Sequence, residues 1–198
     1  MQFTTAALAV IATVVGAVSA QPPPPPPPPP PSNFDGPFSL QIRGPNPNWN
    51  DKFISHTQIG GTSNLAIPDR NSVNYFLNTT DGTLVYIPWP RPRGSREQYP
   101  FIVGTNLASN VGGIYIGDDT AQGTAGWSFT QQGILEVGGL NRFHVCTIST
   151  PRGPVSGLAW QYGTAKPDVA DCTPVALRRV NSRGGPGGPG GPRGRPRM

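Results

Sequence analysis

Between Asn33 and Val180, short runs of alternating apolar and polar residues are separated by turn-forming residues. Residues 38–42 read Phe-Ser-Leu-Gln-Ile and stop at Gly-Pro-Asn-Pro, whereas residues 53–59 stop at two glycines. No stretch of this region keeps the i, i+3, i+4, i+7 apolar spacing of an amphipathic helix over three turns. Period-two runs between turn signals are typical of β-strands. We therefore expect about eleven short strands, at residues 38–42, 53–59, 73–77, 84–87, 99–103, 114–116, 127–129, 134–137, 143–148, 158–162 and 175–180.

This strand spacing predicts an all-β domain, a single antiparallel β-sandwich or barrel. Residues 75–84 and 127–135 resemble each other, because each segment places an aromatic-rich strand before a glycine turn and an aliphatic strand. A duplicated hairpin would suit a β-trefoil-like fold, which is the alternative, although two copies do not by themselves establish a repeat. In the first segment, residues 78–82 predict a hairpin turn in which Asp-Gly supplies positive φ angles. Trp127 and Trp160 lie in strand-like runs and are expected in the core.

Glycine and proline, which total 52 of 198 residues, divide the chain into parts. Ten prolines follow one another at residues 22–31, and eleven Gly and Pro residues lie between 184 and 196. We expect a polyproline linker at 21–32, a folded domain at 33–180 and a disordered Gly/Pro/Arg-rich tail at 181–198. The prolines predict a polyproline II rod of roughly 30 Å, at about 3.1 Å per residue. This rod acts as a spacer or, alternatively, as a ligand for a proline-binding partner.

The first twenty residues have the pattern of a secretory signal peptide. An uncharged apolar run at residues 6–18 is followed by Ser19-Ala20, and small residues at −3 and −1 suit signal peptidase. The run is shorter than the roughly 18 or more apolar residues of a membrane span. Residues 1–20 are therefore expected to direct secretion and to be cleaved, which would leave no membrane anchor, with an uncleaved N-terminal anchor as the alternative.

The net charge of +5 belongs mainly to the tail. The domain carries eleven basic and ten acidic residues, whereas the tail has no acid and four arginines, Arg183, Arg193, Arg195 and Arg197. A nucleic-acid-binding domain would carry its own basic face. In an exported protein such a tail is expected to attract polyanions, possible partners being cell-wall polysaccharides, rather than nucleic acid. A solvated tail without a partner is the alternative.

Cys146 and Cys172 are the only two cysteines. In an exported chain the simplest expectation is one disulfide between them, and two free buried thiols are the alternative. Cys146 ends an alternating run and Cys172 precedes the last predicted strand, so the bridge requires these two strands to lie close together. The spacing suits no zinc site, and no cofactor is expected.

Asn78-Thr79-Thr80 is the one N-x-S/T sequon of the chain. It falls in the predicted hairpin turn, where the exposure needed for N-glycosylation is expected.

Residues suited to catalysis are few. His56 and His144 both lie inside strand-like runs, where a structural role is the simpler interpretation. Asp118 and Asp119, with Glu136, could bind calcium or form a glycosidase carboxylate pair, but an Asx turn after the strand at 114–116 explains the acids equally well. The chain is therefore expected not to be an enzyme, with a small glycosidase as the weaker alternative.

The loop around Trp89 is the expected interaction surface of the domain. Its prolines keep it out of a central strand, so Trp89 should lie at the surface beside Arg91 and Arg93. Tryptophan can stack on a sugar ring and arginine can bind hydroxyl or acidic groups, although Trp89 could equally cap one end of the barrel.

The order of aromatics and cysteines in the second half of the chain, Phe143-His-Val-Cys146, Leu158-Ala-Trp160, Cys172 and Val175-Ala-Leu177, resembles a group of small secreted proteins of filamentous ascomycetes. These are the IgE-binding-like or cell-wall proteins, a domain of unknown function. The resemblance implies a β-rich extracellular domain and the pairing of Cys146 with Cys172, and it implies no active site. We accordingly expect a secreted, non-enzymatic protein of the fungal cell wall or surface, with a carbohydrate-binding or host-directed effector module as the alternative.

Overall fold

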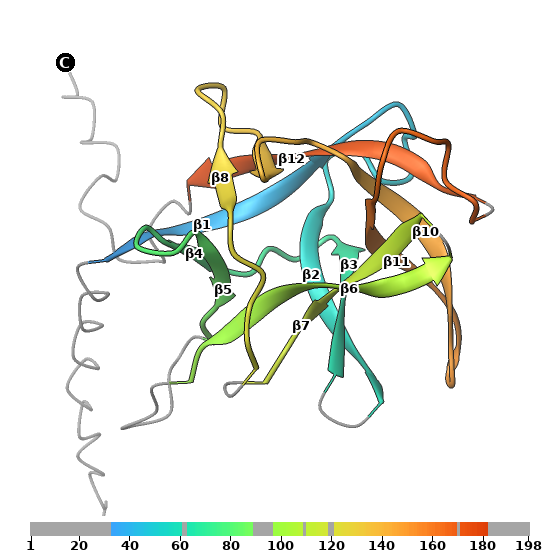
Figure 1. Cartoon of the computed structure of the whole chain (residues 1–198), viewed down its shortest axis with the longest axis horizontal. Coiled ribbons are helices and arrows are strands. Elements are labelled where there is room, and N and C mark those ends of the chain that lie inside the picture. The colour runs from blue at the N-terminus through green and yellow to red at the C-terminus, as the bar shows by residue number, and fades with distance from the viewer. Residues whose placement is uncertain are drawn as a thin grey trace, which may run out of the picture. The chain divides into compact units, whose positions relative to one another are not determined.

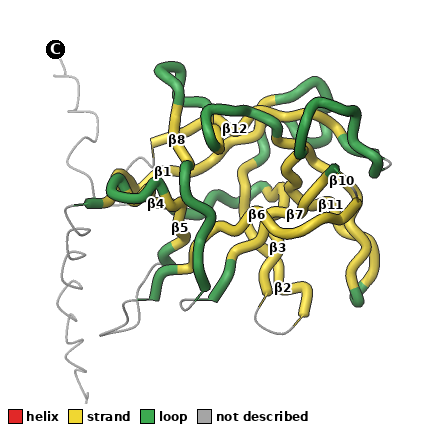
Figure 2. The backbone as a smooth tube through the Cα atoms, viewed as in Figure 1, coloured by secondary structure: helices red, strands yellow, loops and turns green. Residues whose placement is uncertain are grey.

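The computed structural model describes residues 33–60, 63–88, 97–108, 110–118, 121–169 and 171–181. The expected signal peptide, the linker and residues 182–198 of the tail lie outside these ranges. The described residues form strands and loops without a helix (Figure 1, Figure 2). The strands are β1 (Phe34–Arg43), β2 (Phe53–Gly60), β3 (Ser63–Asp69), β4 (Tyr75–Asn78), β5 (Thr83–Tyr86), β6 (Tyr99–Ala108), β7 (Val111–Ile116), β8 (Trp127–Phe129), β9 (Leu135–Val137), β10 (Phe143–Thr150), β11 (Gly153–Gln161) and β12 (Thr173–Asn181).

Every expected strand overlaps one of these elements, so the all-β prediction is confirmed. The sequence pattern missed β3, which contains Pro68 and has two consecutive buried residues, Leu65 and Ala66, in place of a clean apolar–polar alternation. Pro68 pairs with Ile54 of β2, but β3 pairs with β7 only at Asn64 and Leu65. The proline thus lies where β3 has no second ladder partner, the position in which a sheet tolerates proline.

Six strands, β1, β4, β5, β8, β9 and β12, follow one another around a closed ring. Antiparallel ladders join β12 to β1, β1 to β4, β4 to β5 and β8 to β9, with a register shift between Asp35 and Phe38 in the β1–β4 ladder. Single hydrogen bonds complete the ring between the other neighbours. The amide of Trp127 in β8 donates to O of Gly82, the residue before β5, at 2.8 Å. The amide of Arg179 in β12 donates to O of Gly133, shortly before β9, also at 2.8 Å. The predicted barrel is therefore present, and closure leaves few free strand edges.

The remaining six strands form three hairpins, β2–β3, β6–β7 and β10–β11. The hairpins meet one another, since β7 pairs with both β3 and β11, and β3 lies against β11. Their approach is close: a Cβ on Gly157 of β11 would come within 2.8 Å of the Leu65 side chain in β3. A six-stranded barrel with three hairpins, in three successive four-strand units, is the arrangement of a β-trefoil. The trefoil-like alternative thus describes the strand order better than a sandwich does.

The two similar sequence segments occupy equivalent places in this arrangement. They form the β4–β5 and β8–β9 hairpins, with Leu77 opposite Leu84 and Phe129 opposite Leu135. Both turns end at a glycine with positive φ, Gly82 at 68° and Gly133 at 75°. Of the Asp-Gly pair, only the glycine has a positive φ. The two segments are similar in sequence because they form equivalent hairpins of the barrel.

Aromatic side chains run through the centre of the core. Successive ring centroids lie 5.1 to 6.1 Å apart, within the range of favourable aromatic pairs. Trp127 and Trp160 are buried, as predicted. Because each unit of the trefoil supplies rings to this series, its packing joins the three units. The series is Tyr75, Phe101, Trp127, Phe143 and Trp160.

The predicted disulfide joins Cys146 to Cys172, with their Cα atoms 4.1 Å apart. Strands β10 and β12 pair from Phe143↔Val175 to Val145↔Thr173, and the two cysteines continue this register by one position. Both strands therefore bring the cysteines face to face, as the bridge requires. The bridge belongs to a small apolar cluster on the outer side of β10, formed by Val111, Cys146 and Ala159 with Val169 and Cys172 packed against it.

An ion pair between Asp35 and Arg179 fastens β1 to β12. Arg179 Nη2 donates to Asp35 Oδ1 at 2.8 Å, and the guanidinium lies 4.8 Å from the ring centroid of Phe38. The hydrogen bond from Arg179 lowers the pKa of Asp35 below its usual 3.8, against a smaller opposing effect of burial.

We expect this pair to stabilise the fold only above the pKa of Asp35. The folded-state pKa is lowered, so the contribution is present above about pH 4 and is lost as the pH falls through the folded pKa. Asp35→Asn should therefore reduce the free energy of unfolding at pH 6 by less than about 1 kcal/mol, because the pair is partly exposed, and by less at pH 3. Urea unfolding at both pH values measures this; a variant difference that grows at pH 3 would contradict it.

Candidate functional site

A hollow of about 450 Å³ lies where the end of β1, the start of β10, the end of β11 and the start of β12 come together. We call it the arginine hollow. Its volume is within the roughly 300–1,000 Å³ of small-ligand sites. Chain segments about 100 residues apart meet here because β12 pairs with both β1 and β10. The lining residues are Arg43, Gly44, Pro45, Asn141, Arg142, Phe143, His144, Gln161, Pro174, Val175 and Ala176.

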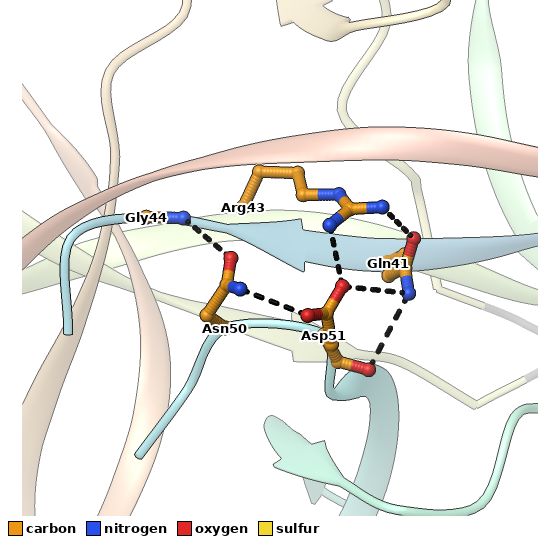
Figure 3. A network of polar contacts seen from close by, with 5 residues as sticks. All are labelled: Gln41, Arg43, Gly44, Asn50 and Asp51. Carbon is orange, nitrogen blue, oxygen red and sulfur yellow. Dashed lines mark hydrogen bonds and ion pairs between the residues drawn. The ribbon is translucent and has the colours of Figure 1, made fainter. Parts of the chain in front are cut away.

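A polar network holds Arg43 at one wall of the hollow (Figure 3). Its guanidinium forms an ion pair with Asp51 and donates to Gln41 Oε1 at 2.9 Å. Asn50 Nδ2 donates to Asp51 Oδ2 at 2.9 Å, and Asn50 Oδ1 accepts from the Gly44 amide at 3.3 Å. The β1–β2 loop thus orients Arg43 and neutralises most of its charge.

Arg142 also lines the hollow and has no such ion pair among the described residues. Its side chain is half-buried, and its guanidinium has no hydrogen-bond or ion-pair partner among the described residues. Its backbone is fixed, because Arg142 O accepts from the Gln161 amide at 3.0 Å. The Gln161 side chain donates to Ala165 O. The hollow therefore presents an arginine whose backbone is held and whose side-chain donors are unused within the described structure.

His144 lies under the hollow and is 7% exposed. Its Nδ1 is 3.3 Å from Arg142 O, a contact in which the ring nitrogen is the donor. Burial lowers the pKa of His144, and the hydrogen bond to Arg142 O offsets part of that shift. A neutral ring that donates to a backbone carbonyl is a structural feature, in agreement with the interpretation from sequence.

The hollow can hold an anion beside an apolar wall. Arginine presents a planar fork of donors that matches a carboxylate or a similar planar anion. Pro45 and Pro174, which are exposed, supply apolar surface next to it. Asn141 adds an amide that can bond to hydroxyl groups. This combination suits a small ligand that carries both a negative charge and hydroxyls.

The structure describes only some of the residues that the sequence predicted as a binding surface or as catalytic carboxylates. Trp89, Arg91, Arg93 and Asp119 lie outside the described residues. Asp118 follows β7, where its carbonyl accepts from the Ala121 amide at 3.2 Å, as in a turn. Glu136 pairs with Ser128 in the β8–β9 hairpin. The described residues contain no group of three or more His, Cys, Asp or Glu that could hold a metal ion.

His56 is the other histidine considered for catalysis. Its ring lies 4.6 Å from that of Tyr86, and its Nδ1 is buried without a partner among the described atoms. Burial lowers its pKa. The ring packs between strands β2 and β5, so a role in packing explains its position.

No pattern in the sequence indicates the arginine hollow. Arg43 and Arg142 are ordinary surface-type residues in the sequence, about 100 positions apart. Only the β1–β12–β10 pairing brings them together, and no local pattern carries that register.

The chain matches no protein-family profile, no curated protein sequence and no solved structure. Within the described part of the chain, no helix is long and apolar enough to cross a membrane.

Proposed function

We propose that this protein is a secreted, non-enzymatic component of the fungal cell wall or surface whose domain binds acidic carbohydrate in the arginine hollow. The carrying observation is Arg142, whose backbone is hydrogen-bonded to β11 and whose half-buried side chain has no partner among the described residues. Such a donor beside apolar walls favours a carboxylate-bearing sugar over a neutral one. The proposal concerns binding and assigns no reaction to the domain.

Three features of the sequence support the location and the partner. Residues 1–20 have the pattern of a secretory signal. The second half of the domain resembles secreted ascomycete wall proteins, and the tail carries four arginines and no acid. A cationic tail would attract the same polyanionic polysaccharide weakly, in a salt-dependent way, while the hollow would recognise a single acidic unit of it.

Removal of the Arg142 guanidinium should weaken binding strongly. We expect Arg142→Gln to lower the affinity for oligouronates by about tenfold or more, as loss of a charged hydrogen bond does. Arg70→Gln, a change at an exposed arginine after β3 that lies outside the hollow, is the matched control and should leave affinity unchanged.

A glycan array with uronate, phosphorylated, sulfated and neutral oligosaccharides measures this, followed by titration of each variant. Uronate binding that is lost in Arg142→Gln alone supports the proposal. Equal losses in both variants would show charge attraction without a site. Preference for neutral glycans, or for phosphate or sulfate over uronate, would overturn the ligand class.

A further inference from the structure

A second hollow, of about 370 Å³, lies beside the β4–β5 hairpin and has Asn78 in its wall. Asn78 is the last residue of β4 and pairs with Thr83 of β5. It is also the acceptor residue of the Asn78-Thr79-Thr80 sequon. The hollow therefore begins at the side chain to which an N-linked glycan would be attached.

The turn fixes the direction of the Asn78 side chain. Asn78 Oδ1 accepts a hydrogen bond from the Thr80 amide at 3.0 Å, which is an Asx turn. The Asn78 Nδ2 has no partner among the described residues. Thr79 donates through its Oγ1 to Asn33 O at 2.9 Å and anchors the turn to the residue that precedes β1. The nitrogen that would be modified is thus held in place and unused.

The lining of this hollow resembles a surface for sugars. Gln98 and Gln122 supply side-chain amides that have no partner among the described residues. Asp81 and Thr83 add oxygens that can accept from hydroxyls. Apolar atoms lie between these groups, on Val85, Pro100, Ala121 and Ala125.

Residues 121–125 contribute one wall of the hollow, and hydrogen bonds hold this segment in place. Thr124 donates its amide to Phe101 O at 2.9 Å, and its Oγ1 accepts from the Val103 amide at 2.9 Å. A Cβ on Gly123 would come within 2.5 Å of Thr83 Cγ2, so this segment packs directly on β5. The segment at residues 121–125 is therefore held beside the Asn78 side chain, and the two form a preformed surface for a group attached to Asn78.

From this arrangement we propose that Asn78 carries an N-linked glycan whose first sugars occupy the hollow formed with Asp81, Thr83, Gln98 and Gln122. In the secretory pathway Asn78 Nδ2 would attack C1 of a lipid-pyrophosphate-linked oligosaccharide. The N–C1 bond forms, the C1–O bond breaks, the amide loses a proton and the lipid pyrophosphate leaves. The inference rests on the export part of the proposed function and is independent of the arginine hollow.

The test is secretion of the full chain from a eukaryotic host, with intact mass measured before and after enzymatic removal of N-glycans. We expect a single glycan that is absent from Thr80→Ala and retained in Thr80→Ser, the matched variant that preserves the sequon. A secreted protein without this glycan would overturn the inference while leaving the export proposal intact. Failure of the host to secrete the chain would instead contradict the export proposal and, with it, the inference.

Occupation of the hollow is tested by amide hydrogen exchange of the glycosylated and enzymatically deglycosylated protein. We expect exchange at residues 121–125 to be severalfold slower when the glycan is present, with no change at Arg152 and Gly153 of the β10–β11 turn. Equal exchange at residues 121–125 in both forms would show that the sugars project into solvent and would overturn their placement.

Discussion

Cys172→Ala is expected to lower the free energy of unfolding by about 3–4 kcal/mol. This is the free-energy equivalent of the chain entropy that a crosslinked loop of this length removes from the unfolded state. The bridge spans 26 positions of sequence and closes a loop that runs from β10 through β11 to the residue before β12. It also fastens the start of β12, a strand that pairs with both β1 and β10. Its loss should therefore loosen the last strand and the segment at residues 162–172 that covers the small cluster around Cys146.

Urea unfolding measures the loss, and limited proteolysis shows where the chain opens. The double variant Cys146→Ala, Cys172→Ala is the control, because it leaves no free thiol. A similar loss in single and double variants attributes the effect to the bridge. Stability unchanged in both, or first cleavage far from residues 162–172, would contradict this role.

Trp127→Ala is expected to lower the free energy of unfolding by about 3–5 kcal/mol, the usual loss for a large buried ring. Trp127 is 2% exposed and lies between Phe101 and Phe143, with ring centroids 5.9 and 6.1 Å away. Phe101 and Trp127 lie in different strands of the second four-strand unit, β5–β8, and Phe143 lies in the third unit, β9–β12. A cavity at this position therefore weakens packing between units as well as within one.

Trp127→Phe is the informative companion variant. The Trp127 Nε1 is buried without a hydrogen-bond partner in the described structure, so phenylalanine removes an unsatisfied donor along with part of the ring. An unsatisfied buried donor opposes folding by about 1–3 kcal/mol, which offsets much of the lost packing. Thermal and urea unfolding should thus show a far smaller loss than for alanine. Equal losses in the two variants would contradict the central packing role given to the ring.

Local patterns were sufficient for the strands and their nearest turns. The period-two runs predict eleven of the strands because successive side chains of a β-strand point to opposite faces of the sheet. The β4–β5 hairpin was predicted because Gly82 supplies the positive φ that its turn requires. β3 was missed because Pro68 and the consecutive buried residues Leu65 and Ala66 depart from the strand pattern. The proline is tolerated because β3 has no second ladder partner at that end.

Long-range register was beyond the reach of these patterns. The cysteine pair could be predicted because two cysteines in an exported chain allow one pairing. Arg43 and Arg142 offer no such constraint, since fifteen basic residues could be combined in many ways. Their meeting depends on the register of β12 against β1 and β10, where one residue of slip would turn each side chain to the opposite face.

The most direct test of acidic-carbohydrate binding in the arginine hollow is a map of amide chemical shifts during titration with a trimer of galacturonic acid. The account predicts that the largest shifts cluster at Arg43–Gly44, Arg142–His144 and Gln161, and that they vanish in Arg142→Gln and with a neutral glucose trimer. Shifts centred on another part of the domain, or equal shifts with the neutral trimer, would contradict it.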